Sequence, residues 1–423
     1  MTLPKKIHLT GADNFFLMLD SASKDDAPDL MNIRMLLQFD SLEKAQSILD
    51  SIQTSPFIHW ACNLQLHKGK MFSTPYWKYI DSGREPLLNE VLLAENQLIT
   101  EELLIQPIHI LQDPPLDFKL INYNTSKVGL LISWHHLFMD GRGAGMLIRH
   151  LSGDLSFNAS QFFKTKTLKA SIIQRIKNLY EMKRVMAAYT NPIAVFPQKK
   201  SSNSLHWQTH TFSFEESKCI QNQAVKNGAK LGLNLYFLAS CAFVIHRFLP
   251  ASNLPLLIPV PYDGRKRGEL GPLCSNQIHF VFYKLEQQEL TSISTIVAAL
   301  NHQLKTQIAT ELPKKYNLLL DTMRYFPQVV FRKMALKAGK SQSSSFLYSS
   351  AGEANWDLAN ITSAAIEDIL LIPPFSVHPG ITFSFSQVNE LVKLNITYNT
   401  LYLSHLDIEK IKTEVVNCLL GNE

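Results

Sequence analysis

The sequence has few cysteines and none of the close pairs that bind zinc or carry redox chemistry. Its 423 residues include only five cysteines, all widely spaced, with no Cys-x-x-Cys pair among them. This excludes a zinc ribbon and a thioredoxin-like motif. Cys241 lies in an apolar stretch, as expected of a small core residue. The usage favours a reducing, cytoplasmic environment.

A long hydrophobic run is also missing. The longest apolar stretch, residues 235–245, is interrupted by Ser240 and closed by His246 and Arg247. It is too short for a membrane span, which needs about 20 residues. Polar residues break the stretch that follows the lysines near the N-terminus, so we expect no signal peptide.

The chain is neither strongly basic nor strongly acidic. Lys and Arg number 41 against 36 Asp and Glu, a net charge of +5, and no segment is densely basic. We therefore expect no nucleic-acid partner. A mild basic surplus suits phosphorylated cofactors, acidic carrier proteins or lipid headgroups. With 46% hydrophobic and 18% charged residues, the chain is globular rather than disordered.

Several enzyme motifs are absent. No Gly-x-Ser-x-Gly elbow occurs, so the α/β-hydrolase route through an acyl-serine lacks support. The glycines at 141, 143 and 145 have the wrong spacing for a dinucleotide fingerprint, and there is no P-loop.

The pattern of apolar residues predicts an α/β protein, an α+β sandwich, made of two similar halves. At roughly 150 residues per domain, the length allows two or three domains or one duplicated fold. We expect a first lobe over residues 1–165, a crossover helix and linker over 166–204, and a second lobe over 205–423. Strands are predicted at residues 32–39, 58–66, 117–123, 128–134, 206–214, 256–260, 276–284, 344–350, 381–386 and 391–398, and helices at 42–52, 164–190, 215–227, 235–248, 292–309, 315–338 and 406–420.

One segment, His135-His136-Leu-Phe-Met-Asp140-Gly141, has the composition of a catalytic site. Random placement would produce this spacing in roughly one such chain in a thousand. An apolar strand delivers the two histidines, and neighbouring strand residues point to opposite faces, so only one can face a given cavity. A neutral imidazole can take a proton from a hydroxyl, amine or thiol near physiological pH. Gly141 permits the turn that leaves the strand, and Gly143 allows close approach of another chain segment.

Two other interpretations of this segment stay open. A single buried histidine is more often a core residue than a catalyst. A metal site is the second alternative, because His136 and Asp140 at i and i+4 could share a helix face. The immediate Gly141 and the lack of a third nearby ligand argue against the metal.

The segment matches HHxxxDG, and the chain thereby resembles the acyl-CoA- and acyl-carrier-dependent acyltransferase superfamily, whose fold is similar to chloramphenicol acetyltransferase. The superfamily includes condensation domains of peptide synthetases, polyketide-associated and plant acyltransferases, and wax ester synthases. Residues 261–265 resemble its Pro-x-x-x-Arg segment. Residues 273–277 resemble a Gly-Asn segment in which Cys-Ser replaces the glycine, residues 346–352 resemble a late strand, and residues 11–16 resemble an Asp-x-x-Phe opening.

The resemblance implies two chloramphenicol acetyltransferase-like lobes forming a V with a central channel. His136 would be the general base that deprotonates the acceptor, without a covalent acyl-enzyme or a metal. His135 and Gly141 would support the motif, and Asp140 would pair with Arg265 of the other lobe. The alternative for Arg265 is a solvated charge in a run of three basic residues.

Candidates for an oxyanion or channel role are Ser349, Ser384 and Asn276, although plain strand serines are the simpler interpretation of the first two.

The resemblance also implies the partners. The donor would be acyl-CoA or a phosphopantetheinyl acyl-carrier protein as co-substrate, with no bound cofactor, and the acceptor an alcohol or amine, in lipid or secondary metabolite biosynthesis. We expect a monomer. The basic helix at 164–190 is interpreted as a solvated face, a docking site for an acidic carrier, or a peripheral membrane contact. A non-catalytic binding or scaffold protein and a metal-dependent hydrolase remain the alternative functions.

Overall fold

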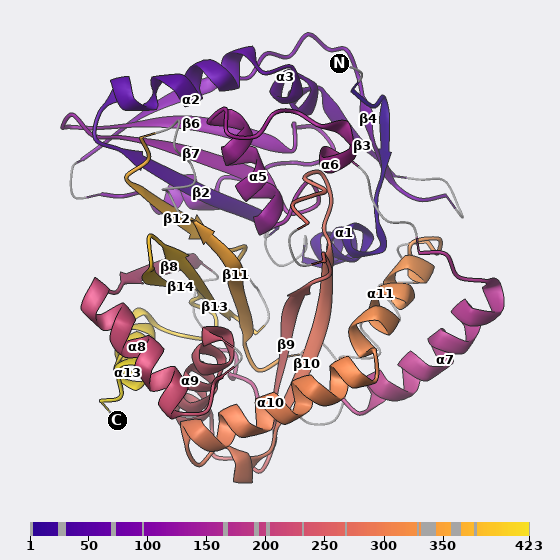
Figure 1. Cartoon of the computed structure of the whole chain (residues 1–423), viewed down its shortest axis with the longest axis vertical. Coiled ribbons are helices and arrows are strands. Elements are labelled where there is room, and N and C mark those ends of the chain that lie inside the picture. The colour runs from indigo at the N-terminus through magenta and orange to yellow at the C-terminus, as the bar shows by residue number, and fades with distance from the viewer. Residues whose placement is uncertain are drawn as a thin grey trace.

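The chain folds into two lobes that lie one above the other in Figure 1. In this computed structural model the structure describes residues 3–23, 31–68, 73–94, 97–163, 168–189, 194–199, 204–230, 232–266, 269–327, 330, 344–356, 365–375 and 379–422. Each lobe has a sheet with helices packed on it, so the predicted α/β class is confirmed. None of the described helices is long and apolar enough to cross a membrane.

The first lobe is built on a five-stranded sheet of order β12-β2-β7-β6-β5. Its central strand β7 (Val128–His135) is buried along its whole length, which explains its continuous apolar sequence. The other strands are β2 (Asn32–Phe39), β5 (Leu88–Leu93), β6 (Leu116–Tyr123) and β12 (Asp368–Ile372). The remaining elements of this lobe are α2 (Leu42–Thr54), α3 (Pro56–Cys62), α4 (Glu101–Ile105), α5 (Gly141–Leu151) and α6 (Ala159–Phe162), with a small sheet of β1 (Lys6–His8), β4 (Tyr76–Tyr79) and β3 (Leu64–His67).

The second lobe has a four-stranded sheet of order β11-β13-β14-β8. One face of it is apolar and packs against α9, in which ten of the sixteen residues are buried. The strands are β8 (Leu205–Thr211), β11 (Leu347–Trp356), β13 (Ile381–Val388) and β14 (Leu391–Asn399), and the helices are α8 (Phe214–Lys226), α9 (Leu233–Phe248) and α13 (His405–Leu420).

The remaining elements adjoin the second lobe, and some of them contribute to its hydrophobic core. The antiparallel pair β9 (Leu256–Asp263) and β10 (Ile278–Leu285) rises between the two lobes, and its connection reaches the first lobe. The helices here are α7 (Ile172–Ala187), α10 (Ile293–Ala309) and α11 (Leu312–Met323), preceded by the short η1 (Gln287–Glu289).

The two halves of the chain exchange elements. Strand β12 comes from the second half but pairs antiparallel with β2 in the first sheet. Helix α1 (Gly11–Ser23) comes from the first half and packs on α11. The approach is close, because a Cβ at Gly11 would lie 2.4 Å from the backbone nitrogen of Asp321. Each half of the chain therefore depends on the other for a strand partner or a packed helix.

Of the elements predicted from the sequence, one is wrong and two fall partly outside the described residues. Residues 58–66 were expected to form a strand, but Pro56–Cys62 is helical and the strand starts at Leu64. Ser55 caps that helix and Pro56 stands in its first turn, where proline is well tolerated. The helix predicted at 315–338 is α11, which ends at Met323, and residues 328–329 and 331–338 lie outside the described residues.

The basic helix predicted at 164–190 is α7, which begins after a capping box formed by Ser171 and Gln174. Its expected ends, residues 164–167 and 190, also lie outside the described residues.

Candidate active site

The HHxxxDG segment forms the connection between β7 and α5. His135 is the last residue of the strand, and Asp140 is the N-cap of the helix, where its Oδ1 accepts the N–H of Gly143 at 2.9 Å. Between them the indole Nε1 of Trp134 donates to the Met139 carbonyl at 3.0 Å. The sequence thus forms a short turn with both ends hydrogen-bonded, which fixes the direction of the histidines.

The two histidines contact different residues of α1, and His136 lies just beyond the end of the strand. The ring of His135 is fully buried, and its Nδ1 accepts the N–H of Leu137 at 3.2 Å. Its Nε2 lies 3.6 Å from a carboxylate oxygen of Asp20 on α1. His135 therefore holds the turn against α1 and is not placed for proton transfer to a substrate.

His136 stacks on Phe16 of α1, with ring centroids 4.0 Å apart and planes 19° from parallel. Its Nδ1 is buried and has no hydrogen-bond partner among the described residues. The backbone is fixed on both sides: the N–H donates to the Met31 carbonyl at 2.7 Å, and the carbonyl accepts from Asn276 Nδ2 at 2.6 Å. The result is an imidazole held in one orientation, with its Nδ1 enclosed by the protein.

Burial sets the protonation state of His136. Desolvation lowers its pKa from the ordinary 6.5 to about 4, against smaller opposing effects that include the Asp140 charge. The ring is therefore neutral near pH 7. A neutral imidazole can accept a proton from an incoming group, and with Nδ1 enclosed the acceptor atom would be Nε2.

Asp140 and Arg265 form a bidentate ion pair between the first lobe and the β9–β10 connection. The two N–H···O distances are 2.9 and 3.0 Å, and both side chains are buried. The second carboxylate oxygen also accepts the N–H of Gln277 at 3.1 Å, and the guanidinium donates to the Pro272 carbonyl at 2.9 Å. This is the pairing that the resemblance implies, and it leaves Arg265 no solvated position in the basic run.

The glycines of the motif differ in what they permit. A Cβ at Gly143 would lie 2.6 Å from the Leu273 carbonyl, so this position needs glycine for close approach. A Cβ at Gly141 would meet nothing within 4 Å, and Gly141 is simply the first residue of α5. The turn after the strand does not depend on glycine there.

Asn276 joins three segments of the site. Its backbone N–H and its Nδ2 both donate to Asp13 Oδ1, at 2.9 and 2.8 Å, and Nδ2 also donates to the His136 carbonyl. An amide nitrogen has two hydrogens, so both are engaged within the protein. None remains for an oxyanion, and the position supports a structural contact between the halves.

Asp13 and Phe16 entered the sequence analysis only as part of the Asp-x-x-Phe resemblance, with no role in the site. Asp13 caps α1 with Thr10, and burial raises the pKa of its carboxyl. The Thr-x-x-Asp spacing is a helix-start signal that could have located the helix, but not its partners.

Ser349 and Ser384 lie side by side on β11 and β13 of the second sheet. Ser384 is buried and Ser349 is half-buried. No described hydrogen bond links either hydroxyl to His136.

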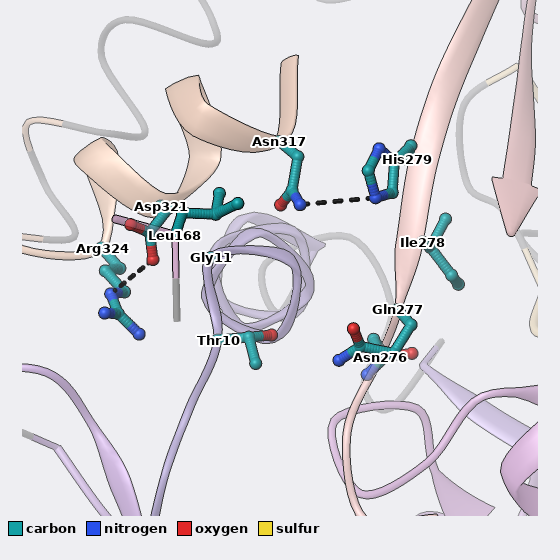
Figure 2. Close-up of a pocket in the computed structure, with 10 residues that line it drawn as sticks. All are labelled: Thr10, Gly11, Leu168, Asn276, Gln277, Ile278, His279, Asn317, Asp321 and Arg324. Atoms are coloured by element: carbon teal, nitrogen blue, oxygen red, sulfur yellow. Dashed lines mark hydrogen bonds and ion pairs between the residues drawn. The ribbon is translucent and has the colours of Figure 1, made fainter. Parts of the chain in front are cut away.

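Figure 2 shows a small pocket next to the site, between α1, α11 and the start of β10. Across it, Asn317 contacts the His279 ring at 3.3 Å and Arg324 pairs with Asp321 at 3.0 Å. The space open to the centres of water-sized molecules is about 30 Å³, room for roughly two waters. The lining residues are Thr10, Gly11, Leu168, Asn276, Gln277, Ile278, His279, Asn317, Asp321 and Arg324.

A metal-dependent site finds no support in these side chains. Within the described ranges, no group of three or more His, Cys, Asp or Glu residues could hold a metal ion. His135, His136 and Asp140 each face a different partner, namely Asp20, Phe16 and Arg265. They do not converge on one point.

Comparison with known proteins identifies the fold. No family model matches the sequence, and no curated protein matches it. Among solved structures, a trichothecene 15-O-acetyltransferase from Fusarium sporotrichioides is similar with a TM-score of 0.68 at 13% identity, over 99% of this chain and 96% of that one. The first condensation domain of the calcium-dependent antibiotic synthetase, in complex with a substrate analogue, gives 0.67 at 12% identity over 99% and 97%.

The epimerization domain from the third module of tyrocidine synthetase B gives a TM-score of 0.63 at 13% identity, over 100% of this chain and 96% of that domain. The chain therefore has the chloramphenicol acetyltransferase-like fold of condensation domains and related acyltransferases.

Proposed function

We propose that this protein is an acyltransferase that moves an acyl group from a thioester to an alcohol or amine, with His136 as general base. The observation that carries the proposal is the buried, neutral imidazole of His136, stacked on Phe16 and held by backbone hydrogen bonds on both sides. The intact motif and the shared fold support the same chemistry.

The reaction transfers one proton twice. The imidazole takes the proton of the acceptor O–H or N–H as the oxygen or nitrogen attacks the thioester carbonyl carbon. The tetrahedral intermediate collapses, the C–S bond breaks, and the thiolate takes the proton from the imidazolium. No acyl-enzyme forms. The donor is acyl-CoA or an acyl-carrier protein, and no bound cofactor or metal takes part.

The remaining motif residues position the base. The Asp140–Arg265 pair fixes the turn that carries His136, and the Asn276 amide fixes its carbonyl. Ser349 and Ser384 stay as oxyanion candidates. Asn276 does not, because its amide hydrogens are already engaged.

The test measures thiol release from acyl-CoAs of short, medium and long chains, and from an acyl-carrier protein, with alcohol and amine acceptors. We expect His136→Ala to abolish release while the circular dichroism spectrum is retained. His302→Ala, which changes an exposed histidine of α10, is the matched control and should keep full activity. Normal turnover by His136→Ala would contradict the mechanism.

A non-catalytic binding protein with this fold is the second candidate. It is favoured by the Cys274-Ser275 pair that stands before Asn276 in place of the glycine found in the resembling enzymes. Saturable binding of acyl-CoA without thiol release under any acceptor would support it.

A further inference from the structure

Helix α7 presents large apolar side chains to the solvent. Ile172, Ile173, Ile176 and Tyr180 are 76%, 79%, 51% and 69% exposed. At 3.6 residues per turn these four positions share one side of the helix. Leaving this much apolar surface in water is unfavourable, and a contiguous exposed patch marks an interaction site.

The opposite side of α7 is firmly attached to α11. Asn178 and Met182 are buried there, and Asn178 Nδ2 donates to the Lys315 carbonyl at 2.9 Å. Arg175 binds the Asp321 carboxylate at 2.7 Å. One side of α7 is therefore attached to α11. No contact among the described residues covers its apolar side.

Cations accompany the apolar side chains. Lys177, Lys183 and Arg184 are exposed on α7, and Lys169 is exposed just before it. Its one carboxylate, Glu181, is half-buried and paired with Lys315 of α11. The Glu181 side chain is still 43% exposed, but it is engaged in that pair, so the exposed charge of the described part of α7 is predominantly positive. Together, Ile172, Ile173, Ile176, Tyr180, Lys177, Lys183 and Arg184 are called the α7 face below.

Two exposed aromatic residues follow the helix on which α7 is docked. Tyr325 and Phe326, just after α11, are exposed. Arg175 contacts Asp321 and also Thr322 at 3.2 Å, so the start of α7 lies beside the end of α11. Figure 1 shows α7 as the outermost element on that side of the molecule.

We infer that the α7 face binds the surface of an anionic lipid bilayer. Isoleucine and tyrosine side chains enter the headgroup boundary, and the lysines and arginine contact the lipid phosphates. The positive face complements anionic lipid. A protruding outer helix fits a flat, deformable surface, whereas a folded acidic protein would have to offer a matching groove.

Vesicle co-sedimentation tests this inference. The full chain is mixed with vesicles of phosphatidylcholine containing about one third phosphatidylglycerol, and with pure phosphatidylcholine vesicles. We expect binding to the anionic vesicles only, weakened as salt rises, because exposed charges are screened. The double variant Ile172→Ser/Ile173→Ser should weaken binding roughly tenfold or more. Lys183→Glu/Arg184→Glu should weaken it comparably.

Leu406→Ser is the matched control. Leu406 is 74% exposed at the start of α13, on the other side of the molecule and among carboxylates such as Asp407 and Glu409. This variant should bind vesicles as the unmodified chain does. Equal weakening by Leu406→Ser would overturn the inference, and so would the absence of binding to anionic vesicles.

Two other partners are outcomes of the same test. Binding to an acidic acyl-carrier protein without binding to vesicles overturns the inference, as does a dimer in analytical ultracentrifugation that Ile172→Ser/Ile173→Ser dissolves. Membrane binding does not depend on acyl transfer. His136→Ala should bind vesicles normally, which separates failure of this inference from failure of the proposed function.

Discussion

At the residue scale, His136 combines tight packing with a fixed orientation. The ring has Phe16 on one face and a backbone hydrogen-bonded at both its N–H and its carbonyl. Such a ring cannot turn away to gain solvent. Its low pKa is therefore a property of the folded state, with consequences for both stability and rate.

The first prediction is a pH-dependent stability that belongs to His136. The unfolded residue binds a proton below pH 6.5, whereas the folded one binds it only near its lowered pKa of about 4. Stability is therefore lost as pH falls through this window, by about 2 kcal/mol between pH 7 and pH 5. Urea unfolding at both pH values checks this, and His136→Gln should lack this part of the loss. Identical pH dependence in the two proteins would contradict it.

The second prediction concerns Phe16, a positioning residue. Phe16→Ala removes the ring that holds the imidazole, and kcat for thiol release should fall by roughly tenfold with KM little changed. Phe15→Ala is the control, because Phe15 is its chain neighbour and packs on Phe280. A KM effect alone in Phe16→Ala would show that Phe16 binds substrate and does not orient the base.

The sequence predicted the motif residues but not their supports. HHxxxDG is local and could be recognised from spacing alone. Asn276 was expected in an oxyanion or channel role, whereas its hydrogen bonds place it between Asp13 and the His136 carbonyl. These three residues are far apart in the chain, and no local pattern specifies which distant segments meet.

At the element scale, the start of α5 depends on a close approach by the other half. The third prediction compares Gly143 with Gly141, two residues before it in the same helix. Gly143→Ala must displace the Leu273 carbonyl, and we expect a loss of about 1–3 kcal/mol in unfolding free energy. Gly141→Ala has free space, and alanine is the better helix former, so stability should hold or rise. Thermal unfolding measures both; equal effects would contradict the close contact.

The fourth prediction removes the charge at the α5 cap. Asp140→Asn removes the bidentate partner of the buried Arg265 guanidinium and leaves it only the Asp263 carboxylate at 3.2 Å, so the free energy of unfolding should fall by about 3 kcal/mol and activity should fall with it. Arg142→Ala breaks a more exposed ion pair with Asp263 and should cost less than about 1 kcal/mol. An unchanged melting temperature in Asp140→Asn would disprove the pair.

Elements with strong periodicity were predictable, and those defined by tertiary contacts were not. Residues 235–248 and 292–309 match α9 and α10 closely. The strand predicted over 58–66 failed because the Ser55 cap and Pro56 start a helix there. Strand β12 was missed, since its short apolar run becomes a strand only by pairing with β2.

At the scale of the whole molecule, the exchange of elements makes the lobes interdependent. The fifth prediction is that residues 205–423 alone do not form a stable folded unit, because β12 would lack β2 and α11 would lack α1. An unpaired strand edge favours aggregation. Co-expression with residues 1–204 should restore recoverable protein, measured by size-exclusion chromatography. A monomeric, cooperatively unfolding 205–423 fragment would contradict it.

The fold class followed from mixed strands and helices in both halves, and the motif's resemblance supplied the architecture. The exchange of β12 and α1 between the halves could not be predicted from the sequence, because composition and periodicity describe a segment and do not specify which distant segment it packs against. The boundaries at 165 and 205 stay predictions. These boundaries cut the chain at single positions, but the sheet of the first lobe also contains residues 368–372, which lie after both boundaries.

The Asp140–Arg265 pair also orders events in time. During synthesis, the turn carrying His136 leaves the ribosome long before Arg265, Asn276 and β12 exist as peptide. Domains usually begin folding from the N-terminus as they emerge. Here the turn that carries His136 lacks its partners until Arg265 and Asn276 have been made, so a chain that ends before them carries the full motif without these fixing contacts.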